Sequence, residues 1–222
     1  AAGHAQHDHR TTGHVFATVV AHALDHRRTA GVAHAEALAT DAGMTSYHAV
    51  IKEGGAAPGM KVGIIGFGGL GQIGTRAAVL KGAEVHVAEL KQDVWDLAKA
   101  AGAVSVVSDA DEWARQDFDL VVDYAGFDTT QKGLNAIRRG GRVVQVGLGK
   151  PTFTIATHTI LGKTIVGSLG GTVQDIEEVY ELLLNKEIEP AYTEIAFEEI
   201  GDGLRRLAAN QVTGRLVARF GD

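Results

Sequence analysis

The sequence contains no cysteine, and this absence removes several kinds of chemistry. Without a thiol the chain can form no disulfide, no thiolate nucleophile and no zinc lobe held by cysteines. It also lacks an apolar run long enough to cross a bilayer, and its N-terminus lacks the basic region and apolar stretch that mark an exported protein. We therefore expect a cytoplasmic protein with no membrane partner.

Positive charge is scarce as well. The 222 residues include 21 Lys and Arg against 27 Asp and Glu, which gives a net charge of −6 with neutral His and a pI of about 5.9. Binding to a phosphate backbone requires a basic stripe, so we expect no nucleic-acid partner. A hydrophobic fraction of 45% and a mean hydropathy of +0.02 describe a globular protein of one domain or one and a half.

Residues 1 to about 35 differ in composition from the rest of the chain. Seven of the ten histidines lie there, mixed with Ala, Arg, Thr and Gly, namely His4, His7, His9, His14, His22, His26 and His34. These residues show no sustained helical or strand period, so we assign no firm structure to them. We interpret residues 1 to about 33 as out of frame or otherwise foreign to the fold.

From residue 35 onward, short β-branched runs alternate with helical patterns, as in the βαβ units of a parallel sheet. We predict six strands: Lys61–Gly66, Glu84–Glu89, Val104–Ser108, Asp119–Asp123, Arg142–Gly147 and Lys163–Ser168. Several are apolar almost throughout, which is typical of strands covered on both faces. Right-handed crossovers between them predict an α/β fold with a doubly wound parallel sheet (Rossmann), whose ligand cleft lies at the carboxyl ends of the strands.

Helical patterns fill the intervals between and after these strands. Apolar faces are formed by Ile73, Ala77 and Leu80, by Val94, Leu97, Ala98 and Ala101, and by Ile200, Leu204, Leu207 and Ala208. Gly82 and Gly102 follow the first two helices, where C-terminal caps are expected. A further helix is predicted from Ile176 to about Leu184, and a last strand over Leu216–Phe220.

A glycine-rich turn, Gly66-Phe67-Gly68-Gly69-Leu70-Gly71, lies between the first predicted strand and the first helix. Gly66 permits the tight turn, Gly68 leaves room for backbone to approach a pyrophosphate, and Gly71 lets the helix pack close to the strand. The helix N-terminus then offers N–H groups and a partial positive charge to the anion. This order of elements predicts a dinucleotide site.

An acidic residue strengthens that prediction. Glu89 ends the second predicted strand 18 residues beyond Gly71, where its carboxylate can accept hydrogen bonds from both hydroxyls of the adenine ribose. A 2′-phosphate would meet this carboxylate as a like charge, so we expect NAD rather than NADP. Two alternatives stay open: a structural glycine turn beside a surface Glu, and the similar loop and acid of a methyltransferase that uses S-adenosylmethionine.

From about Leu38 to the C-terminus the sequence resembles the zinc-containing, medium-chain alcohol dehydrogenases. Besides the glycine turn and Glu89, the segments in family order are Asp41-Ala42-Gly43-Met44-Thr45-Ser46-Tyr47, Val146-Gly147-Leu148, Gly167-Ser168-Leu169-Gly170 and Thr213-Gly214-Arg215. The resemblance implies an oxidoreductase that transfers a hydride between an alcohol or carbonyl substrate and NAD, with zinc as the Lewis acid. It also implies an NAD-binding domain over 41–184, flanked by an atypical segment with a remnant of a GroES-like catalytic domain (1–40) and by a segment returning to that domain (185–222).

The same resemblance assigns roles to individual residues. Asp41 stands where the family has a catalytic zinc ligand, and capping of the adjacent helix is the alternative for it. The implied coenzyme contacts are Thr45 and Leu70 beside the nicotinamide ring, Val146, Gly147 and Ser168 around its carboxamide, and Arg215 at the pyrophosphate. For Arg215 the alternative is an ordinary solvated side chain. His48 and His86 are expected to be structural, hydrogen-bonded imidazoles.

Part of the family pattern is missing. The family has a zinc-binding Cys and a Gly-His-Glu segment before the Asp41 position, and neither is present among the 40 residues that precede it here. Because catalytic zinc takes three protein ligands, Asp41 alone cannot hold it, and the activity of this chain alone is in question. We expect any metal bound by His4, His7 and His9 to be adventitious, since nothing fixes that tract near a nicotinamide. A non-catalytic dinucleotide-binding domain and a zinc-free quinone reductase stay open as alternatives.

The sixth predicted strand bears on assembly. Lys163–Ser168 is an apolar strand at the edge of the predicted sheet. An exposed apolar edge tends to pair with another chain, so we expect a homodimer in which this strand pairs across a two-fold axis.

Overall fold

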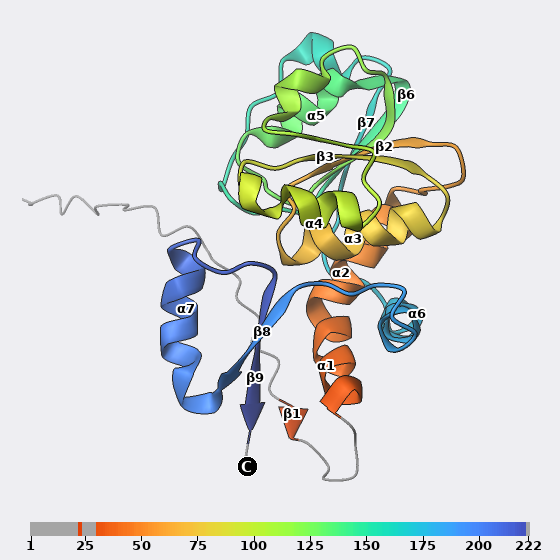
Figure 1. The fold of residues 1–222 in the computed structure, drawn as a ribbon. Helices are drawn as coiled ribbons and strands as arrows, with labels where there is room; N and C mark the ends of the chain where they lie inside the picture. The colour runs from red at the N-terminus through yellow and green to blue at the C-terminus, as the bar shows by residue number, and fades with distance from the viewer. Residues whose placement is uncertain (1–21, 24–29, 221–222) are drawn as a thin grey trace, which may run out of the picture.

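The structure is a computed structural model that describes residues 22–23 and 30–220. Two parallel sheets organise this part of the chain, a large one of six strands and a small one of three. The large sheet fills the upper part of Figure 1, with helices on both of its faces, and the small sheet lies below it. Within the described residues, no helix has the length and apolarity needed to cross a membrane.

The large sheet has the strand order of a doubly wound fold. Its strands, in spatial order and all parallel, are β4 (Ser105–Val107), β3 (Glu84–Ala88), β2 (Lys61–Ile65), β5 (Phe118–Asp123), β6 (Ile137–Gln145) and β7 (Thr164–Gly167). The chain thus enters the sheet in the middle, winds outward to β4, and then returns to wind outward to β7. This order confirms the predicted Rossmann fold.

The predicted strands lie where expected, with one clear difference at β6. Five of the six match their predicted bounds to within one residue at either end. The strand β6 instead begins at Ile137, five residues before the predicted Arg142, because Ile137 already pairs with Phe118 on β5. The pairing register shifts between Phe118 and Leu120, opposite the exposed residues Arg138 and Arg139. Because these two arginines interrupt the apolar pattern, the sequence did not indicate that the strand begins at Ile137.

The helices of this region are α3 (Gly69–Leu80), η3 (Gln92–Val94), α4 (Trp95–Ala100), η4 (Ala110–Trp113), α5 (Thr129–Ala136) and η5 (Thr157–Ile160). Alternate strand residues face two separate cores. On one face Ile64 packs with Ile73 of α3, and on the other Val121 packs with Trp113 and with Leu134 of α5. Both faces of the sheet are therefore covered, as the apolar strands predicted.

The prediction for the second helix was wrong in one respect, namely the residues of its buried face. Leu97, assigned to the face that packs on the sheet, is 44% exposed, whereas Ala98 beside it is fully buried. Val94 lies in the 3₁₀ turn η3 rather than in α4, so the α-helical spacing assumed between Val94 and Leu97 does not hold. Gly82 and Gly102 have φ angles of +82° and +103°, as expected of residues that end helices.

A continuous helical run precedes the large sheet. It consists of α1 (Ala30–Leu38), η1 (Ala39–Gly43), α2 (Met44–Tyr47) and η2 (His48–Glu53), of which η1 and η2 are π-helical. π-helical turns are uncommon and often occur at functional positions. Asp41 lies inside η1, and the residues at the N-caps of η1 and α2 are Leu38 and Gly43. Helix capping is therefore not the role of Asp41.

Two described parts of the N-terminal segment, residues 22–23 and 30–35, have secondary structure that we did not assign. The helix α1 begins at Ala30, inside the segment to which no structure was assigned, and residues His22–Ala23 form a short strand, β1. The Ala-rich composition of α1 favours a helix, and Ala35, Ala37 and Leu38 join the main core. His4, His7, His9, His14 and His26 lie outside the described residues.

The last fifth of the chain builds the small sheet. Its elements are α6 (Val173–Leu184), β8 (Tyr192–Ala196), η6 (Phe197–Glu199), α7 (Ile200–Ala208) and β9 (Arg215–Phe220). The strand β9 lies between β8, which sequence analysis missed, and β1. Helix α6 begins three residues before the predicted Ile176, because Thr172 and Asp175 form a capping box at its start.

Candidate functional site

The glycine-rich turn lies at the carboxyl end of the central strand β2. Gly66 has a φ of +87°, which a residue with a side chain rarely adopts, and its N–H donates to the carbonyl of Ala88 at 2.9 Å. A Cβ on Gly71 would overlap the carbonyl oxygen of Gly66, whereas a Cβ on Gly68 would meet nothing within 4 Å. The turn is thus closed tightly on its inner side and open in front of Gly68.

Helix α3 starts directly behind this opening. Its N-cap is Gly68, which has no side chain to occupy the amides of the first turn and is itself exposed. Bare amides and the positive end of the helix dipole favour an anion in front of such a turn. The opening at Gly68 therefore has the shape and polarity that a diphosphate requires.

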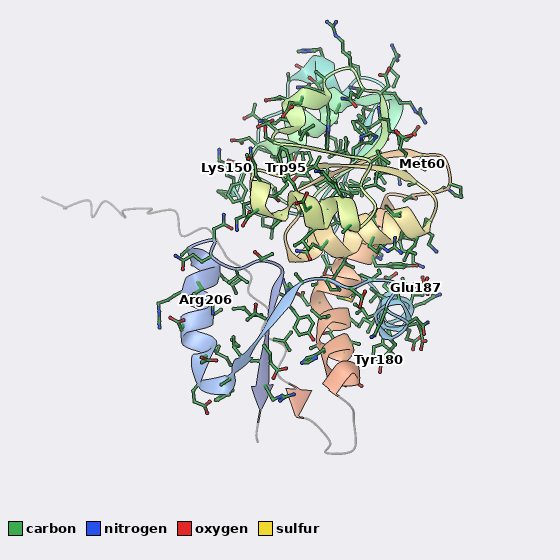
Figure 2. The ribbon with its side chains drawn as sticks, in the orientation of Figure 1. Met60, Trp95, Lys150, Tyr180, Glu187 and Arg206 are labelled. Carbon is green, nitrogen blue, oxygen red and sulfur yellow. The ribbon has the colours of Figure 1, made fainter. Side chains whose placement is uncertain are left out.

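Glu89 faces the turn from the neighbouring strand β3. Its carboxylate accepts a hydrogen bond from the N–H of Phe67 at 2.6 Å and another from the N–H of Lys91 at 2.8 Å. Its carbonyl accepts from the indole N–H of Trp95 at 2.8 Å; Trp95 is labelled in Figure 2. Each carboxylate oxygen can accept more than one hydrogen bond, so Glu89 is held in place while keeping room for hydroxyl donors.

A cavity of about 290 Å³ opens beside Glu89 at the carboxyl ends of four strands. Its walls come from residues that end or follow β2, β3, β4 and β5, among them Gly66, Glu89, Leu90, Ser108 and Phe127. This is the position at which a doubly wound sheet binds its ligand, and the volume lies near the lower end of small-molecule pockets.

Of the residues that line this cavity, sequence analysis identified as site residues only those that follow β2 and β3. Asp109 and Lys132 also line it, and the Lys132 ammonium lies 2.7 Å from the carboxylate of Asp109 and 3.0 Å from that of Asp111. The hydrogen bond from Lys132 lowers the pKa of Asp109, and the hydrogen bond to Asp109 raises the pKa of Lys132. The rule that ligands bind where parallel strands end would have pointed to the residues after β4 and β5 as well.

The loop after β5 is held by one buried carboxylate. Asp123, the last residue of β5, is fully buried and accepts hydrogen bonds from the amides of Ala125 and Gly126 and from the hydroxyls of Thr129 and Thr130, all at 2.7 to 3.0 Å. Four donors on one carboxylate fix the chain sharply. This loop in turn forms one wall of the cavity beside Glu89.

Arg215, from the far end of the chain, reaches the glycine turn. A Cβ on Gly69 would collide with the side chain of Arg215, whose guanidinium pairs with the carboxylate of Asp41 at 3.1 Å. The Arg215 side chain is 16% exposed, so it is packed against the turn rather than freely solvated. The structure thus brings together three residues, Asp41, Gly69 and Arg215, that are far apart in the sequence.

The residues expected near a nicotinamide lie on the helices α2 and α3, which pack together, and just after the strands β6 and β7. Thr45 is in α2, which packs on α3, the helix that carries Leu70. The amides of Val146 and Gly147 both donate to the carbonyl of Asp123 at 2.9 Å.

Ser168 follows β7, the neighbour of β6, and its amide donates to the carbonyl of Gln145 at 2.9 Å. The loop after β7 continues to Gly171, which lies against Met44 at the start of α2. The two strand ends and the helix that carries Thr45 therefore converge on one side of the sheet.

Two tyrosines and a histidine join this helical run to its neighbours. Tyr124 donates to the carbonyl of Ser46 at 2.8 Å, and burial raises its pKa. Tyr47 donates to Glu178 at 2.7 Å. His48 lies 2.8 Å from the fully buried carboxylate of Asp175, which confirms the expected hydrogen-bonded, structural imidazole.

His86 behaves as expected too. It is buried in β3, with one ring nitrogen 2.7 Å from the Ser105 hydroxyl and the other 2.9 Å from the Glu84 carboxylate. Neither imidazole therefore has a free position at the glycine turn.

The described residues do not fit a catalytic zinc site. Asp41, the expected ligand, is paired with the guanidinium of Arg215. Among the described residues, no three side chains of His, Cys, Asp or Glu are grouped so that they could hold a metal ion. Three protein ligands are the usual number for catalytic zinc, so no metal-dependent step can be built on this part of the chain.

Comparisons with known proteins agree with this geometry. A family model described as zinc-binding dehydrogenase matches residues 69–185. An alcohol dehydrogenase of Geobacillus stearothermophilus is 34% identical over 191 residues, which cover 80% of this chain and 56% of that protein.

Solved structures show the same relationship. The acetophenone reductase of Geotrichum candidum, solved in complex with NAD, superposes with a TM-score of 0.79 at 31% identity and covers 87% of this chain and 57% of that one. The alcohol dehydrogenase of Aeropyrum pernix gives a TM-score of 0.73 at 28% identity, over 81% of this chain and 56% of that one. The chain spans about half the length of these relatives. Because the family model covers more than half of its residues, the chain belongs to the zinc-binding dehydrogenase family.

Proposed function

We propose that this chain is the coenzyme-binding part of an oxidoreductase that transfers a hydride between NAD and an alcohol or carbonyl substrate. The observation that carries the proposal is the placement of the Glu89 carboxylate directly opposite the glycine turn, 2.6 Å from the amide of Phe67, beside a cavity at the strand ends. A ribose in that cavity would bring its hydroxyls to the carboxylate and its diphosphate to the opening at Gly68.

The choice of NAD over NADP rests on charge. A 2′-phosphate on the adenine ribose would place its negative charge against the carboxylate of Glu89. The acetophenone reductase was solved with NAD, which supports the same choice for this chain.

The residues of this chain bind and orient the coenzyme in this proposal. Thr45 and Leu70 would flank the nicotinamide ring, Val146, Gly147 and Ser168 would hold its carboxamide, and Arg215 would donate to the diphosphate. Bound NAD supplies the hydride acceptor, and the protein fixes the distance between the ring and the substrate. Zinc takes no part in this account, because the described residues do not fit it.

We propose the domain organisation that the sequence predicted. Residues 41–184 would form the NAD-binding domain, residues 1–40 would be an atypical His-rich segment with a remnant of a GroES-like catalytic domain, and residues 185–222 would return to that domain. The small sheet supports this division, because β1 and β8–β9 pair with one another and not with the large sheet. The cytoplasmic location stays a prediction.

We further propose a homodimer formed through β7. This strand is at the edge of the large sheet, and Leu161 just before it is 67% exposed. An unpaired edge with apolar neighbours favours pairing with a second copy. Light scattering tests the proposal, which a monomeric mass at micromolar concentration would overturn.

Calorimetric titration of the chain with NAD and with NADP tests the proposed function. We expect NAD to bind, and to bind at least roughly tenfold more tightly than NADP, because one desolvated like-charge contact costs on the order of 1.4 kcal/mol or more. Glu89→Gln should weaken this preference, whereas Glu84→Gln, which changes an exposed carboxylate at the other end of β3, should leave it unchanged and so controls for net charge. Failure to bind either coenzyme contradicts the proposal.

A non-catalytic dinucleotide-binding domain is the second candidate. It is favoured by the pairing of Asp41 with Arg215, which leaves the expected zinc ligand engaged elsewhere. Both candidates bind NAD, but only the first predicts turnover. Assays of simple alcohols with NAD, with and without added zinc, therefore distinguish them.

A further inference from the structure

Gln72 is a polar side chain in a place where an amphipathic helix would have an apolar one. It lies in the second turn of α3, between Gly71 and Ile73, and is 6% exposed. Its amide oxygen accepts a hydrogen bond from the N–H of Ala191 at 2.8 Å, and its amide nitrogen lies 3.5 Å from the carbonyl of Phe67. Gln72 thus joins the glycine turn to a segment almost 120 residues away.

That segment connects α6 to β8 and passes along α3, as Figure 1 shows, with Glu187 labelled in Figure 2. A second link holds it to the same helix, because the guanidinium of Arg76 donates to the carbonyl of Glu187 at 2.7 Å. The segment is therefore fixed to α3 at two points, one of which is the buried amide of Gln72.

Ala191 passes the position of this segment on to Arg215. Its carbonyl accepts a hydrogen bond from the N–H of Arg215 at 3.0 Å. Gly214 has a φ of +75°, and a Cβ there would overlap the carbonyl oxygen of Ala191, so the two chains are as close as backbone allows. The backbone of Arg215 is thus placed by Ala191, which is placed by Gln72.

The side chain of Arg215 runs from this point toward the start of α3. It crosses Gly69 in the first turn of α3 and ends at the carboxylate of Asp41, 3.1 Å away. A guanidinium gains most from phosphate oxygens when its planar fork is already oriented.

We propose that Gln72 is a positioning residue for diphosphate binding, which acts by fixing Ala191 and through it Arg215. The inference rests on the proposed function in one respect, namely that the ligand carries a diphosphate. It adds a residue to which neither the sequence pattern nor the family resemblance assigned a role.

The variant Gln72→Met tests the proposal, since Met keeps the unbranched shape and removes both hydrogen-bonding groups. We expect the affinity for ADP-ribose and for NAD to fall roughly fivefold, the effect of losing one neutral hydrogen bond, while the affinity for adenosine, which has no phosphate, stays unchanged. Gln131→Met is the matched control, because Gln131 also accepts from a distant backbone amide, that of Ala156 at 2.9 Å, but lies on α5.

A double-mutant cycle separates positioning from a merely structural role. In the background of Arg215→Met, adding Gln72→Met should cause no further loss of ADP-ribose affinity, because the group that Gln72 positions is already gone. Additive losses, or an equal loss for adenosine, overturn the proposal.

Two precautions keep the result decisive. Gln72→Ala is the second variant in case the Met variant does not fold. Gln72 lines a cavity of about 400 Å³, so in the Ala variant water from this cavity can reach the amide of Ala191 and satisfy it. It carries the same expectation. If the wild-type chain binds adenosine but neither ADP-ribose nor NAD, both the proposed function and this inference fail; if the wild type binds all three and the variants match it, only this inference fails.

Discussion

Two glycines of the same turn, Gly68 and Gly71, are expected to respond to the same substitution in opposite ways. A Cβ on Gly71 would lie about 1 Å inside the 3.0 Å limit that real Cβ atoms keep from their neighbours, and the atom it meets is a backbone oxygen of Gly66, which cannot swing away. A Cβ on Gly68 meets nothing within 4 Å, and its φ of −77° suits any residue. Ala at position 71 therefore strains the fold, and Ala at position 68 fills the opening in front of the turn.

The magnitudes follow from these clearances. Forcing a backbone shift of this size costs roughly 1–3 kcal/mol, and the better helix propensity of Ala returns up to about 1 kcal/mol, so Gly71→Ala should lower the free energy of unfolding by about 1 kcal/mol. Gly68→Ala should change it by less than about 0.5 kcal/mol. The methyl group at position 68 stands where the diphosphate must approach, so the affinity for NAD should fall at least roughly tenfold, or about 1.4 kcal/mol.

Urea unfolding and calorimetric titration with NAD, performed on both variants, measure the two effects. We expect Gly71→Ala to unfold at a lower urea concentration than the wild type. We expect Gly68→Ala to unfold at the same urea concentration as the wild type but to bind NAD weakly. Wild-type affinity in Gly68→Ala would refute the reasoning about the opening. Equal stability of the two variants would refute the reasoning about the contact between α3 and the turn.

Three further predictions concern the supports of the site. Tyr124→Phe removes the donor to the carbonyl of Ser46 and should lower the free energy of unfolding by about 1 kcal/mol in urea; an unchanged midpoint contradicts this. Asp123→Ala leaves four donors, two of them buried and two partly buried, without this acceptor and should cost about 3 kcal/mol in the same assay, so a loss below about 1 kcal/mol contradicts the role of this carboxylate. Lys132→Met removes the cation that lowers the pKa of Asp109 below its ordinary value of 3.8. A carboxyl group whose pKa is lowered in the folded state stabilises the fold at pH values above its unfolded-state pKa, and this stabilisation is lost as the pH falls through the folded-state pKa. The melting temperature of the variant should therefore be lower than that of the wild type near neutral pH and equal to it below the folded-state pKa. A difference in melting temperature that persists in acid contradicts the assignment.

The central part of the fold could be predicted because its signals are local. The unit β2–α3–β3 contains an apolar run, a glycine turn and an amphipathic helix in direct succession. The parallel register pairs Ile65 with Ala88, so the next residues along, Gly66 and Glu89, lie side by side. The expected position of Glu89 opposite the turn thus followed from strand pairing alone.

Other features depend on contacts that no local pattern contains. The pairing of Arg215 with Asp41 joins residues 174 positions apart, and it exists only because β9 returns to the start of α3. The strand β8 is mostly exposed along its length, with Ile195 as its buried residue, so it lacks the alternation that marks a strand. Gln72 left a weaker signal, a polar residue among the small and apolar ones of Gly69–Gly74, and its role can be inferred only from its hydrogen bond with Ala191.

The return of β9 to the glycine turn also has a consequence for synthesis of the protein. A ribosome delivers every strand of the six-stranded sheet by residue 167, but Arg215 follows 48 residues later. A nascent chain can therefore complete the sheet long before any guanidinium stands beside Gly69. The pairing of Arg215 with Asp41 beside the glycine turn can therefore form only after the large sheet has been synthesised.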